Sequence, residues 1–469
     1  MFTKRALLKN IREVCRVAYQ EQETQALYEA LIHHLDQERI DSFRELFLDI
    51  HPYEQSQFFL TVAEEIRMLV YTYLSPSEMA EIFQNFDIEE QEEYISEMEP
   101  TYAAKMLAEM YADDAVDVLN ELNPEQIASY LTIMDDDAAD EIKELLHYEE
   151  KTAGSIMTTE FVSIRAHQTV KRAMQILRQE APEAETIYYI FVLDQQKRLV
   201  GVISLRDLII AEEDTLIEDI MNERVVSVSV GEDQEEAARI MRDYDFLALP
   251  VLDFQNHLLG IITHDDIVDV IEEEASEDYS KLAAISDDGT LDRNPFSSAR
   301  KRLPWLIILL FLGMLTASLI GQFEATLDKV ALLAVFIPLI AGMAGNTGTQ
   351  ALAVVVRGIA TGDYEENSKW ALIVREAGTG LITGTTCGVL VTIIIFLWKG
   401  TFFLGMLVGF SLLCTLIVAT LAGALVPLLM HKLNIDPAVA SGPFITTIND
   451  IISILIYFGM ATAFMSHLV

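Results

Sequence analysis

The hydrophobic pattern of this chain changes abruptly at Pro304. Before that residue, apolar and polar positions alternate at helical or strand spacing, and after it the sequence is mostly apolar. Five long apolar runs cover about residues 304–323, 330–356, 371–397, 402–430 and 439–466. Each is long enough to cross a bilayer as a helix. We therefore predict a transmembrane domain over 304–469 with five spanning helices.

Residues 1–150 have the pattern of many short helices. They contain no glycine, and four prolines stand 24 residues apart, from Pro52 to Pro124. Proline is favoured in the first turn of a helix, so each proline marks a helix start. Acidic helix starts recur between them, at Ala112 and Asp135. A repeat of this length with two short helices predicts an α-helical solenoid over 1–150.

Residues 151–272 change to two similar α/β halves, each with the order strand, helix, strand, turn, strand, helix. The halves end in matching sequences, Gly-Val-Ile-Ser-x-x-Asp at 201–207 and Gly-Ile-Ile-Thr-x-x-Asp at 260–266. This pattern resembles a tandem pair of cystathionine-β-synthase-type (CBS) modules. Such pairs often bind adenosine nucleotides, with the carboxylate of the motif on the ribose. The alternative is that Ser204 and Asp207 only cap the following helix.

The formal net charge of −41 is concentrated before the apolar part. Residues 1–303 carry 65 acids and 26 bases, a net charge of −39, whereas only 8 acids and 6 bases follow. An acidic surface argues against nucleic-acid binding, which needs a basic footprint. It suits divalent cations, or it keeps the domain soluble. The three cysteines form no CxxC pair, and no P-loop, nucleophile–base set or His-Glu-x-x-His motif indicates an enzyme.

Residues 273–303 connect the α/β halves to the first apolar run. Acidic side chains crowd the sequence from Asp266 to Asp278, at i, i+3 and i+4 spacings. Asp113 and Asp117 in the helical repeat have the same i, i+4 spacing. The helix dipole favours an acid at the first of these positions but does not explain the second. Like charges at these spacings destabilise a helix unless they are solvated, paired with bases or bridged by cations. A solvated face is the usual explanation, but this run leads directly to the membrane domain. We predict a connecting helix followed by a linker.

Basic residues predict the orientation of the apolar runs. With the N-terminus in the cytoplasm, seven basic residues flank the inner ends and two flank the outer ends. The inner residues are Arg300, Lys301, Arg302, Arg357, Lys369, Arg375 and Lys432, and the outer ones are Lys329 and Lys399. The excess of positive charge inside therefore predicts cytoplasmic N-terminal domains, a multi-pass protein of the plasma membrane and a C-terminus outside.

One carboxylate, Asp450, lies within the last apolar run. A charge at membrane depth costs at least about 2.5–3.5 kcal/mol on insertion scales. Thr446, Asn449 and Ser453 share its helix face, because they stand at i, i+3 and i+7 from Thr446 with Asp450 at i+4. Such a stripe indicates the wall of a cation pathway. The alternative is a seam of helix–helix hydrogen bonds, which suits the hydroxyl side chains as well as a pathway does.

The second apolar run contains glycine at every third position, at Gly342, Gly345 and Gly348, with Asn346 and Gln350 among them. Glycine weakens a regular helix, and broken backbone at membrane depth is tolerated only within protein or beside a water-filled cavity. This favours a second pore-lining segment. Close packing of helices through small residues is the alternative, and the two can hold together.

The order of these parts resembles the MgtE family of magnesium channels and transporters. The resemblance covers essentially the whole chain, including Gly-Asn-Thr-Gly-Thr-Gln at 345–350 and Thr-Thr-x-x-Asp at 446–450. The fold class is then multidomain, with an α-helical solenoid, tandem α/β CBS modules and a five-helix transmembrane domain. The resemblance implies a homodimer with its pore on the two-fold axis. It also implies passive, magnesium-selective uptake, closed by cytoplasmic Mg²⁺ through the connecting (plug) helix, and modulation by ATP.

The resemblance also assigns residues. In the membrane domain Asp450 would hold hydrated magnesium, and Asp436 would be a second aspartate. The implied pore lining comprises Gly342, Gly345, Asn346, Gly348, Thr446 and Asn449. The implied cytoplasmic magnesium ligands are Asp113, Asp117, Glu235, Asp245, Asp266, Asp269, Glu274, Glu277 and Asp278. The implied ATP contacts are Tyr189, Arg206, Asp207 and Phe246. In the family pattern a main-chain oxygen is the ligand at the position of Arg242. The Arg242 side chain departs from that pattern.

The chemistry of magnesium agrees with this assignment. Magnesium loses its water reluctantly, so a pore for it needs outer-shell acceptors and one or two carboxylates. A single Asp450 supplies only one carboxylate for a divalent ion. Two such residues across a two-fold axis would suit the ion. Two alternatives stay open. One is transport of another divalent cation, such as Co²⁺, Mn²⁺ or Ca²⁺, and the other is a membrane-tethered nucleotide sensor without transport.

Overall fold

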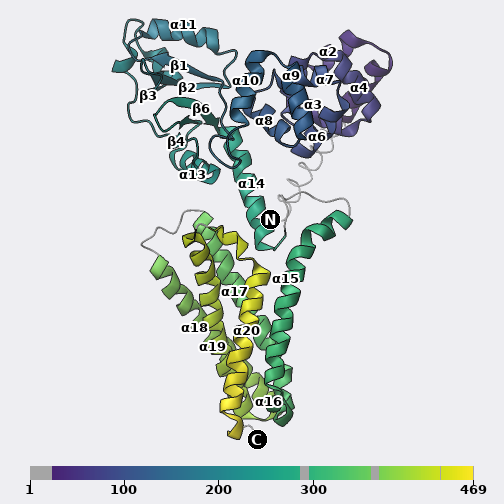
Figure 1. Cartoon of the computed structure of the whole chain (residues 1–469), viewed down its shortest axis with the longest axis vertical. Coiled ribbons are helices and arrows are strands. Elements are labelled where there is room, and N and C mark those ends of the chain that lie inside the picture. Colours follow the sequence, from purple (N-terminus) through teal and green to yellow (C-terminus); the bar gives the residue numbers. More distant parts are fainter. Residues whose placement is uncertain (1–23, 286–294, 361–368, 434, 468–469) are drawn as a thin grey trace, which may run out of the picture. The chain divides into compact units, whose positions relative to one another are not determined.

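The structure is a computed structural model that divides into two compact units between Val270 and Ile271 (Figure 1). It describes residues 24–285, 295–360, 369–433 and 435–467. The first part of the predicted helical repeat (1–23), the first half of the predicted linker (286–294) and the loop 361–368 lie outside the described residues.

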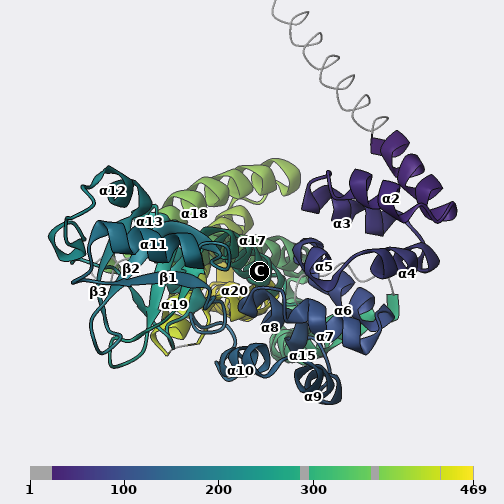
Figure 2. The same cartoon turned by 90° about the horizontal axis from the view of Figure 1, so that it is seen from above.

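The first unit begins with short helices in chain order, after a helical stretch at 24–36. Their bounds are α2 (Ile40–Phe47), α3 (Pro52–Thr61), α4 (Glu64–Tyr73), α5 (Pro76–Phe83), α6 (Ile88–Glu97), α7 (Pro100–Leu107), α8 (Ala112–Asn120), α9 (Pro124–Ile133) and α10 (Asp136–Leu145). Figure 2 gives a second view of this succession of short helices. The predicted helical repeat is confirmed.

Local capping sets the helix starts of the repeat. All four prolines stand at the first position of a helix, in α3, α5, α7 and α9. Ser75 and Asn123 precede two of them and form capping boxes with the residues three positions on. Each box satisfies two backbone N–H groups that the first turn leaves without a helical partner.

An aromatic core holds the first helices together. Phe43, Phe47, Phe58 and Phe59 are fully buried, and the rings of Phe43 and Phe47 stack with centroids 5.0 Å apart. Burial of one such side chain is worth about 1.5–3 kcal/mol. The same core cluster continues into the α/β part, where it includes Ile262.

Two three-stranded sheets form the α/β part, with strand orders β1-β2-β3 and β4-β5-β6. In each sheet the first strand pairs parallel with the second, and the second pairs antiparallel with the third. The first half comprises β1 (Phe161–Arg165), α11 (Val170–Glu180), β2 (Thr186–Leu193), β3 (Leu199–Ser204) and α12 (Leu205–Ile210). The second comprises β4 (Val228–Ser229), α13 (Gln234–Tyr244), β5 (Ala248–Leu252), β6 (Leu258–Thr263) and α14 (His264–Leu282). The predicted duplication is confirmed.

The connecting segment predicted from residue 273 continues a helix that begins earlier. It is the later part of α14, which starts at His264 directly after β6 and runs without a break to Leu282. The last helix of the second α/β half and the connecting helix are therefore one element. The division between the two units falls inside it.

The second unit contains five helices that are long and apolar enough to cross a membrane, among the described residues. The long helices are α15 (Pro295–Gln322), α17 (Ile337–Ala360), α18 (Lys369–Lys399), α19 (Phe402–Lys432) and α20 (Gly442–Ala463). The short α16 (Glu324–Lys329) and the 3-10 turns η2 (Ala331–Phe336), η4 (Pro437–Val439) and η5 (Met465–His467) complete it. Helix α15 begins at Pro295 and continues through Pro304, so the first apolar run is the later part of a longer helix.

Candidate functional site

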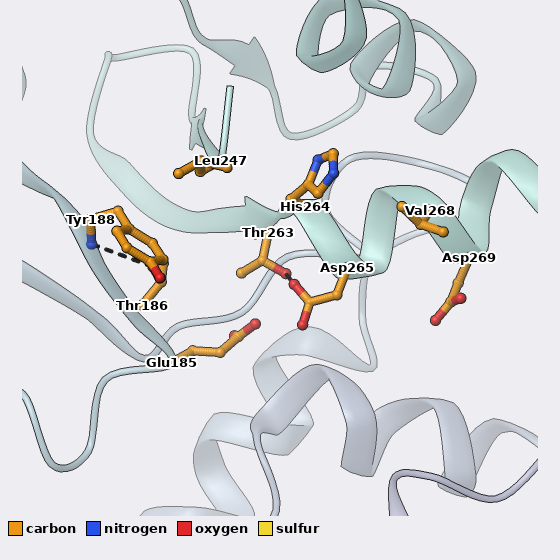
Figure 3. Close-up of a pocket in the computed structure, with 9 residues that line it drawn as sticks. All are labelled: Glu185, Thr186, Tyr188, Leu247, Thr263, His264, Asp265, Val268 and Asp269. Atoms are coloured by element: carbon orange, nitrogen blue, oxygen red, sulfur yellow. Dashed lines mark hydrogen bonds between the residues drawn. The ribbon is translucent and has the colours of Figure 1, made fainter. Parts of the chain in front are cut away.

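Carboxylates converge where α14 begins. Glu185 precedes β2, and Asp265 and Asp266 stand in the first turn of α14. One ligand oxygen from each of the three lies within 4.8 Å of the others. Figure 3 shows the Glu185 and Asp265 side chains directed toward the same space. Three carboxylates at this spacing can share a divalent cation.

The Thr263 hydroxyl holds the two aspartates in place. Its oxygen lies 2.6 Å from an Asp265 carboxylate oxygen and 2.5 Å from an Asp266 carboxylate oxygen, so the two aspartates share its one proton. The Thr263 backbone N–H also donates to Asp266, at 3.3 Å. In the first half the Ser204 hydroxyl likewise donates to Asp207, at 2.6 Å, but the backbone bond there runs from the Asp207 N–H to the Ser204 oxygen, at 3.1 Å. Capping of α12 by Ser204 and Asp207 is therefore confirmed.

Helix α8 adds two acidic residues to this cluster. Asp113 is only 6% exposed, and burial together with the charge of Asp266 raises its pKa well above the usual value. Burial and the charge of Asp266 also raise the pKa of Asp114 and of Glu185. Burial raises the pKa of Asp266 to about 6. Burial and mutual repulsion thus disfavour ionisation of all the acids in the cluster. A bound cation would offset this repulsion.

Glu160 joins the helical repeat to the α/β part beside this cluster. One of its oxygens accepts the N–H of Ala112, the first residue of α8, at 3.1 Å. The other accepts from the Thr158 hydroxyl at 2.6 Å and from the Thr159 N–H at 3.0 Å. Glu160 therefore serves as a structural link and keeps α8 close to the acids of α14.

The structure brings together only some of the predicted cytoplasmic ligands. The charge of Asp266 acts on buried Asp113, whereas Asp117 is exposed farther along α8 and Asp269 lines a pocket of about 560 Å³ beside Glu185. Sequence reasoning missed Asp114, Glu185 and Asp265. The first and last of these adjoin predicted ligands, so position alone could have suggested them. Nothing in the sequence around Glu185 marks it.

Glu235 and Asp245 lie at opposite ends of α13. Glu235 is in its first turn, and Asp245 ends the helix in the left-handed conformation, with φ 54°. Ten residues of helix separate them by about 15 Å. The two residues therefore cannot share one ion within a single chain.

A second acidic group contains a lysine. The Nζ atom of Lys281 in α14 lies 2.6 Å from a Glu277 oxygen. It also lies 2.6 Å from an oxygen of Asp436, which is in the loop before α20. Burial lowers the pKa of Lys281, but hydrogen bonds with Asp436 and Glu277 outweigh burial and raise it. Burial and the charge of Asp436 raise the pKa of Asp278 to about 6. Of the acids predicted here, Glu277, Asp278 and Asp436 therefore form one group, and Glu274 adds its charge to it.

The third candidate region is the contact between α17 and α20. The Thr349 and Thr446 hydroxyl oxygens are 3.3 Å apart, and the Asn449 amide donates to the Ala344 carbonyl at 3.5 Å. Asn449 is 1% exposed, and its Oδ1 has no hydrogen-bond partner among the residues that the structure describes, whereas the adjacent Asp450 is only partly buried. Within one chain, Asn449 thus packs against α17 while Asp450 lies on a less enclosed face.

The glycines of α17 permit this contact. The helix is continuous through Gly342, Gly345 and Gly348, so the backbone break that their spacing suggested does not occur. A Cβ on Gly345 would lie 2.6 Å from the Thr446 methyl carbon, and one on Gly348 would lie 1.9 Å from the Asn449 amide nitrogen. Close packing explains these two positions. Around Gly342 a Cβ would meet nothing within 4 Å, and Asn346 is exposed.

The first α/β half carries a pocket of about 580 Å³. Two of the predicted nucleotide contacts, Tyr189 and Arg206, line it together with Ser204. Asp207 is hydrogen-bonded to Ser204, and Phe246 stacks on Tyr244 with ring centroids 5.3 Å apart. An aromatic wall, a guanidinium group and a nearby carboxylate are suited to a base, a phosphate and a ribose respectively.

Comparison with known proteins identifies the family. The chain matches the model of a divalent cation transporter family, MgtE, over residues 337–460, and that of the MgtE intracellular N domain over 50–151. CBS domain models match residues 153–214 and 217–273. A magnesium transporter MgtE from Enterococcus faecalis is 54% identical over 96% of this chain and 99% of its own. The chain belongs to the MgtE family.

Other relatives support the same membership. A magnesium transporter MgtE from Bacillus subtilis is 42% identical over 92% of this chain and 95% of its own. The crystal structure of the soluble part of a magnesium transporter covers 54% of this chain and 99% of that chain, with 56% identity and a TM-score of 0.52. MgtE proteins are membrane transporters and not enzymes, as the lack of catalytic motifs predicted. The helical domain, CBS domains and five apolar helices have the architecture of this family.

Proposed function

We propose that this chain is a magnesium-selective channel through which Mg²⁺ enters the cell passively, down its electrochemical gradient. The observation that carries the proposal is the 54% identity, over nearly the full length of both chains, to a relative that is named a magnesium transporter. The partly buried carboxylate of Asp450 within the apolar helix α20 supports it. Such a carboxylate can hold an ion that keeps most of its water.

The conducting form is a homodimer, with the two Asp450 side chains facing each other near the two-fold axis. Two carboxylates would balance the charge of one hydrated Mg²⁺, whereas a single one would not. Exposed positions of α17, such as Gly342 and Asn346, are then available to line the pathway with Thr446. Three buried residues do not line the pathway but pack within one chain and support the residues that line it: Asn449, Gly345 and Gly348.

Cytoplasmic Mg²⁺ closes the channel by binding to the acidic groups. The cluster of Asp113, Asp114, Glu185, Asp265 and Asp266 joins α8 to the start of α14, so an ion there would tie the helical domain to the connecting helix. A second ion would act at Glu277, Asp278 and Asp436, with Glu274 nearby. Asp117, Glu235, Asp245 and Asp269 are further ligands, some shared between the two subunits. A ligand that prefers the closed arrangement shifts the population toward it.

ATP modulates this response from the pocket of the first CBS module. Tyr189 and Phe246 would contact the base, Arg206 a phosphate and Asp207 the ribose. The size of the pocket, about 580 Å³, is within the range of small-molecule sites. The charge of bound ATP would also act on the acidic residues nearby.

The chain divides into an acidic helical domain (1–150), tandem CBS domains (151–272), a connecting plug helix with its linker (273–303) and a pore domain (304–469). The protein lies in the plasma membrane, with the first three parts in the cytoplasm and the C-terminus outside. Basic residues at the inner ends of the spans support this orientation.

Flux through reconstituted liposomes tests the proposal. Purified chain in liposomes loaded with a magnesium-sensitive dye should admit Mg²⁺, and flux should fall when Mg²⁺ is added on the side of the soluble domains. Competition with Co²⁺, Mn²⁺ and Ca²⁺ in the same preparation tests ion choice. Nucleotide binding without any ion flux would instead support a membrane-tethered sensor and overturn the proposal.

A further inference from the structure

A short connection, residues 323–336, joins α15 to α17 at the proposed outer end of the membrane domain. It contains α16 and the 3-10 turn η2, which continues directly into α17. Two of its residues are enclosed by the chain, since Thr326 is 6% exposed and Leu333 is fully buried. The position of this connection therefore determines where the outer end of α17 lies.

The hydroxyl group of Tyr457 in α20 ties the connection to that helix. It donates to the Leu333 carbonyl oxygen at 3.0 Å, and Tyr457 is only 1% exposed. A tyrosine is apolar apart from its hydroxyl, which needs a partner when it is buried. Here the partner is a backbone group of the turn η2, so the bond holds the chain itself and not another flexible side chain.

Two neighbouring side chains of α20 strengthen this tie. The ring of Phe458 stacks on Phe323, with centroids 5.1 Å apart and an interplanar angle of 14°. One turn farther along α20, the hydroxyl oxygens of Thr462 and Thr326 are 3.1 Å apart. Residues 457, 458 and 462 thus each contact the connection, at its start, in α16 and in η2. A single buried cluster includes Leu333 and both aromatic residues of α20.

The pore carboxylate lies between this tie and a second one. Asp450 is seven residues before Tyr457 in α20, which is about two turns or 10 Å toward the inner end. On its other side, Asn449 fits against Gly348 of α17. Helix α20 is therefore held to α17 at the inner level through Gly348 and at the outer level through η2. The spacing of the two helices at Asp450 depends on both contacts.

This spacing bears on the choice between divalent ions. Mg²⁺ demands near-octahedral geometry and loses its water reluctantly, whereas Ca²⁺ accepts six to eight oxygen ligands in flexible geometry. Selectivity between them is therefore a matter of the size and the rigidity of the site. Walls of fixed spacing suit the hydrated Mg²⁺, and walls that move can also adapt to Ca²⁺.

We propose that Tyr457 is a positioning residue for ion selectivity, which keeps the spacing of α17 and α20 at Asp450 fixed and so favours Mg²⁺ over Ca²⁺. This inference rests on the proposed function, because it concerns the pathway past Asp450. Tyr457 itself does not touch the ion. Its hydroxyl acts through Leu333 and η2 on the outer end of α17.

The ratio of Mg²⁺ flux to Ca²⁺ flux in liposomes tests this role. Y457F removes the hydroxyl and keeps the ring, so the ratio should fall by about fivefold, the factor that one net hydrogen bond contributes to an equilibrium. A smaller amount of folded protein would lower both fluxes alike and leave the ratio unchanged. S411A is the matched control, since it removes a buried hydroxyl that contacts Met460 of α20 and not the connection. Its ratio should equal that of the parent.

Amide hydrogen exchange on the full chain in detergent measures the tie without ion flux. In Y457F the amides of residues 331–336 should exchange about fivefold faster than in the parent, while those of residues 345–349 stay as protected. T326V removes the other hydroxyl contact and should change exchange in the same direction. It takes the place of Y457F if that variant does not fold.

Unchanged exchange at residues 331–336 in the hydroxyl-deletion variants would overturn the inference. So would a parental flux ratio in a Y457F channel that conducts Mg²⁺. Absence of Mg²⁺ flux through the parent is a different result, which would overturn the proposed function before any variant is compared. The two failures are therefore distinguishable in one set of liposomes.

Discussion

Gly348 and Asn449 fit together at the contact between α17 and α20. A Cβ on Gly348 would lie 1.9 Å from the Asn449 amide nitrogen, so the absence of a side chain at one position makes room for the other. The carbonyl of Gly348 also lies 2.3 Å from the position of a Cβ on Gly423 in α19. Three helices thus meet at one residue. The orientation of Asp450, next to Asn449, depends on this contact.

An alanine at residue 348 should therefore disrupt the pore domain. We expect G348A to destabilise the chain by about 1–3 kcal/mol, the usual cost of overpacking, and to reduce Mg²⁺ flux. G342A in the same helix is the matched control for stability and should unfold at nearly the temperature of the parent, since a Cβ there meets no described residue of the chain within 4 Å. Adding N449A to G348A should recover part of the thermal stability measured in detergent. Equal stability of G348A and G342A would contradict this packing.

The helix starts of the repeat could be predicted because their causes are local. Proline at the first position and a cap such as Ser75 or Asn123 act within four residues, so the sequence contains the whole signal. Proline does not mark a helix start at Pro304. There the preceding Ser-Ala-Arg-Lys-Arg segment continues the helix, and proline in its interior removes one hydrogen bond without ending it.

The candidate sites depend on contacts that are distant in sequence, and these were harder to predict. Glu185 meets Asp265, and Lys281 meets Asp436, only because the fold brings separate elements together. The polar face of α20 was predicted from the sequence. That Asn449 and Asp450 on this face have different surroundings was not predicted. Adjacent residues of a helix point about 100° apart, so Asn449 can face α17 while Asp450 does not. The neighbours that decide this difference are not visible in the pattern of one helix.

The acidic cluster at α14 should make metal-free stability depend on pH. The folded pKa of Asp266 is raised to about 6, above its value of about 3.9 in the unfolded chain. The folded state then binds more protons, so this contribution is present below about pH 4 and is lost as the pH rises toward 6. In EDTA, the Tm of the full chain relative to D266N should therefore fall between pH 4 and pH 7. A rise of this difference over the same range would contradict the sign.

The cluster should also set the sensitivity to cytoplasmic Mg²⁺. D113N removes a buried carboxyl group whose ionised form repels Asp266, so the metal-free protein should become more stable, while Mg²⁺ loses a ligand. We expect the Mg²⁺ concentration for half-inhibition of flux to rise about tenfold, within the usual range of coupling between sites. D214N, at an exposed loop position, is the matched control. Unchanged half-inhibition in D113N would remove Asp113 from the regulatory site.

Nucleotide binding in the first CBS module should depend on Arg206. A charge-assisted hydrogen bond to a phosphate is worth about 1.5–3 kcal/mol, so R206A should weaken ATP binding by about tenfold or more. R178A removes an exposed arginine from α11 in the same module and should bind ATP as the parent does. Isothermal titration calorimetry on the full chain in detergent measures both. Equal affinities of R206A and the parent would mean that the nucleotide binds elsewhere or that Arg206 does not contact its phosphate.

Asp450 should be essential for flux but not for folding. D450N keeps the size and the hydrogen-bonding capacity of the side chain and removes its charge, so we expect Mg²⁺ flux to fall at least about tenfold while the Tm stays similar or rises. The Tm can rise because a charge at membrane depth costs free energy that an amide does not. D328N, at an exposed carboxylate of α16 outside the five spans, is the control and should conduct normally. Normal flux through D450N would mean that the ion passes without this carboxylate, and the pore would have to be sought along another face of α17 and α20.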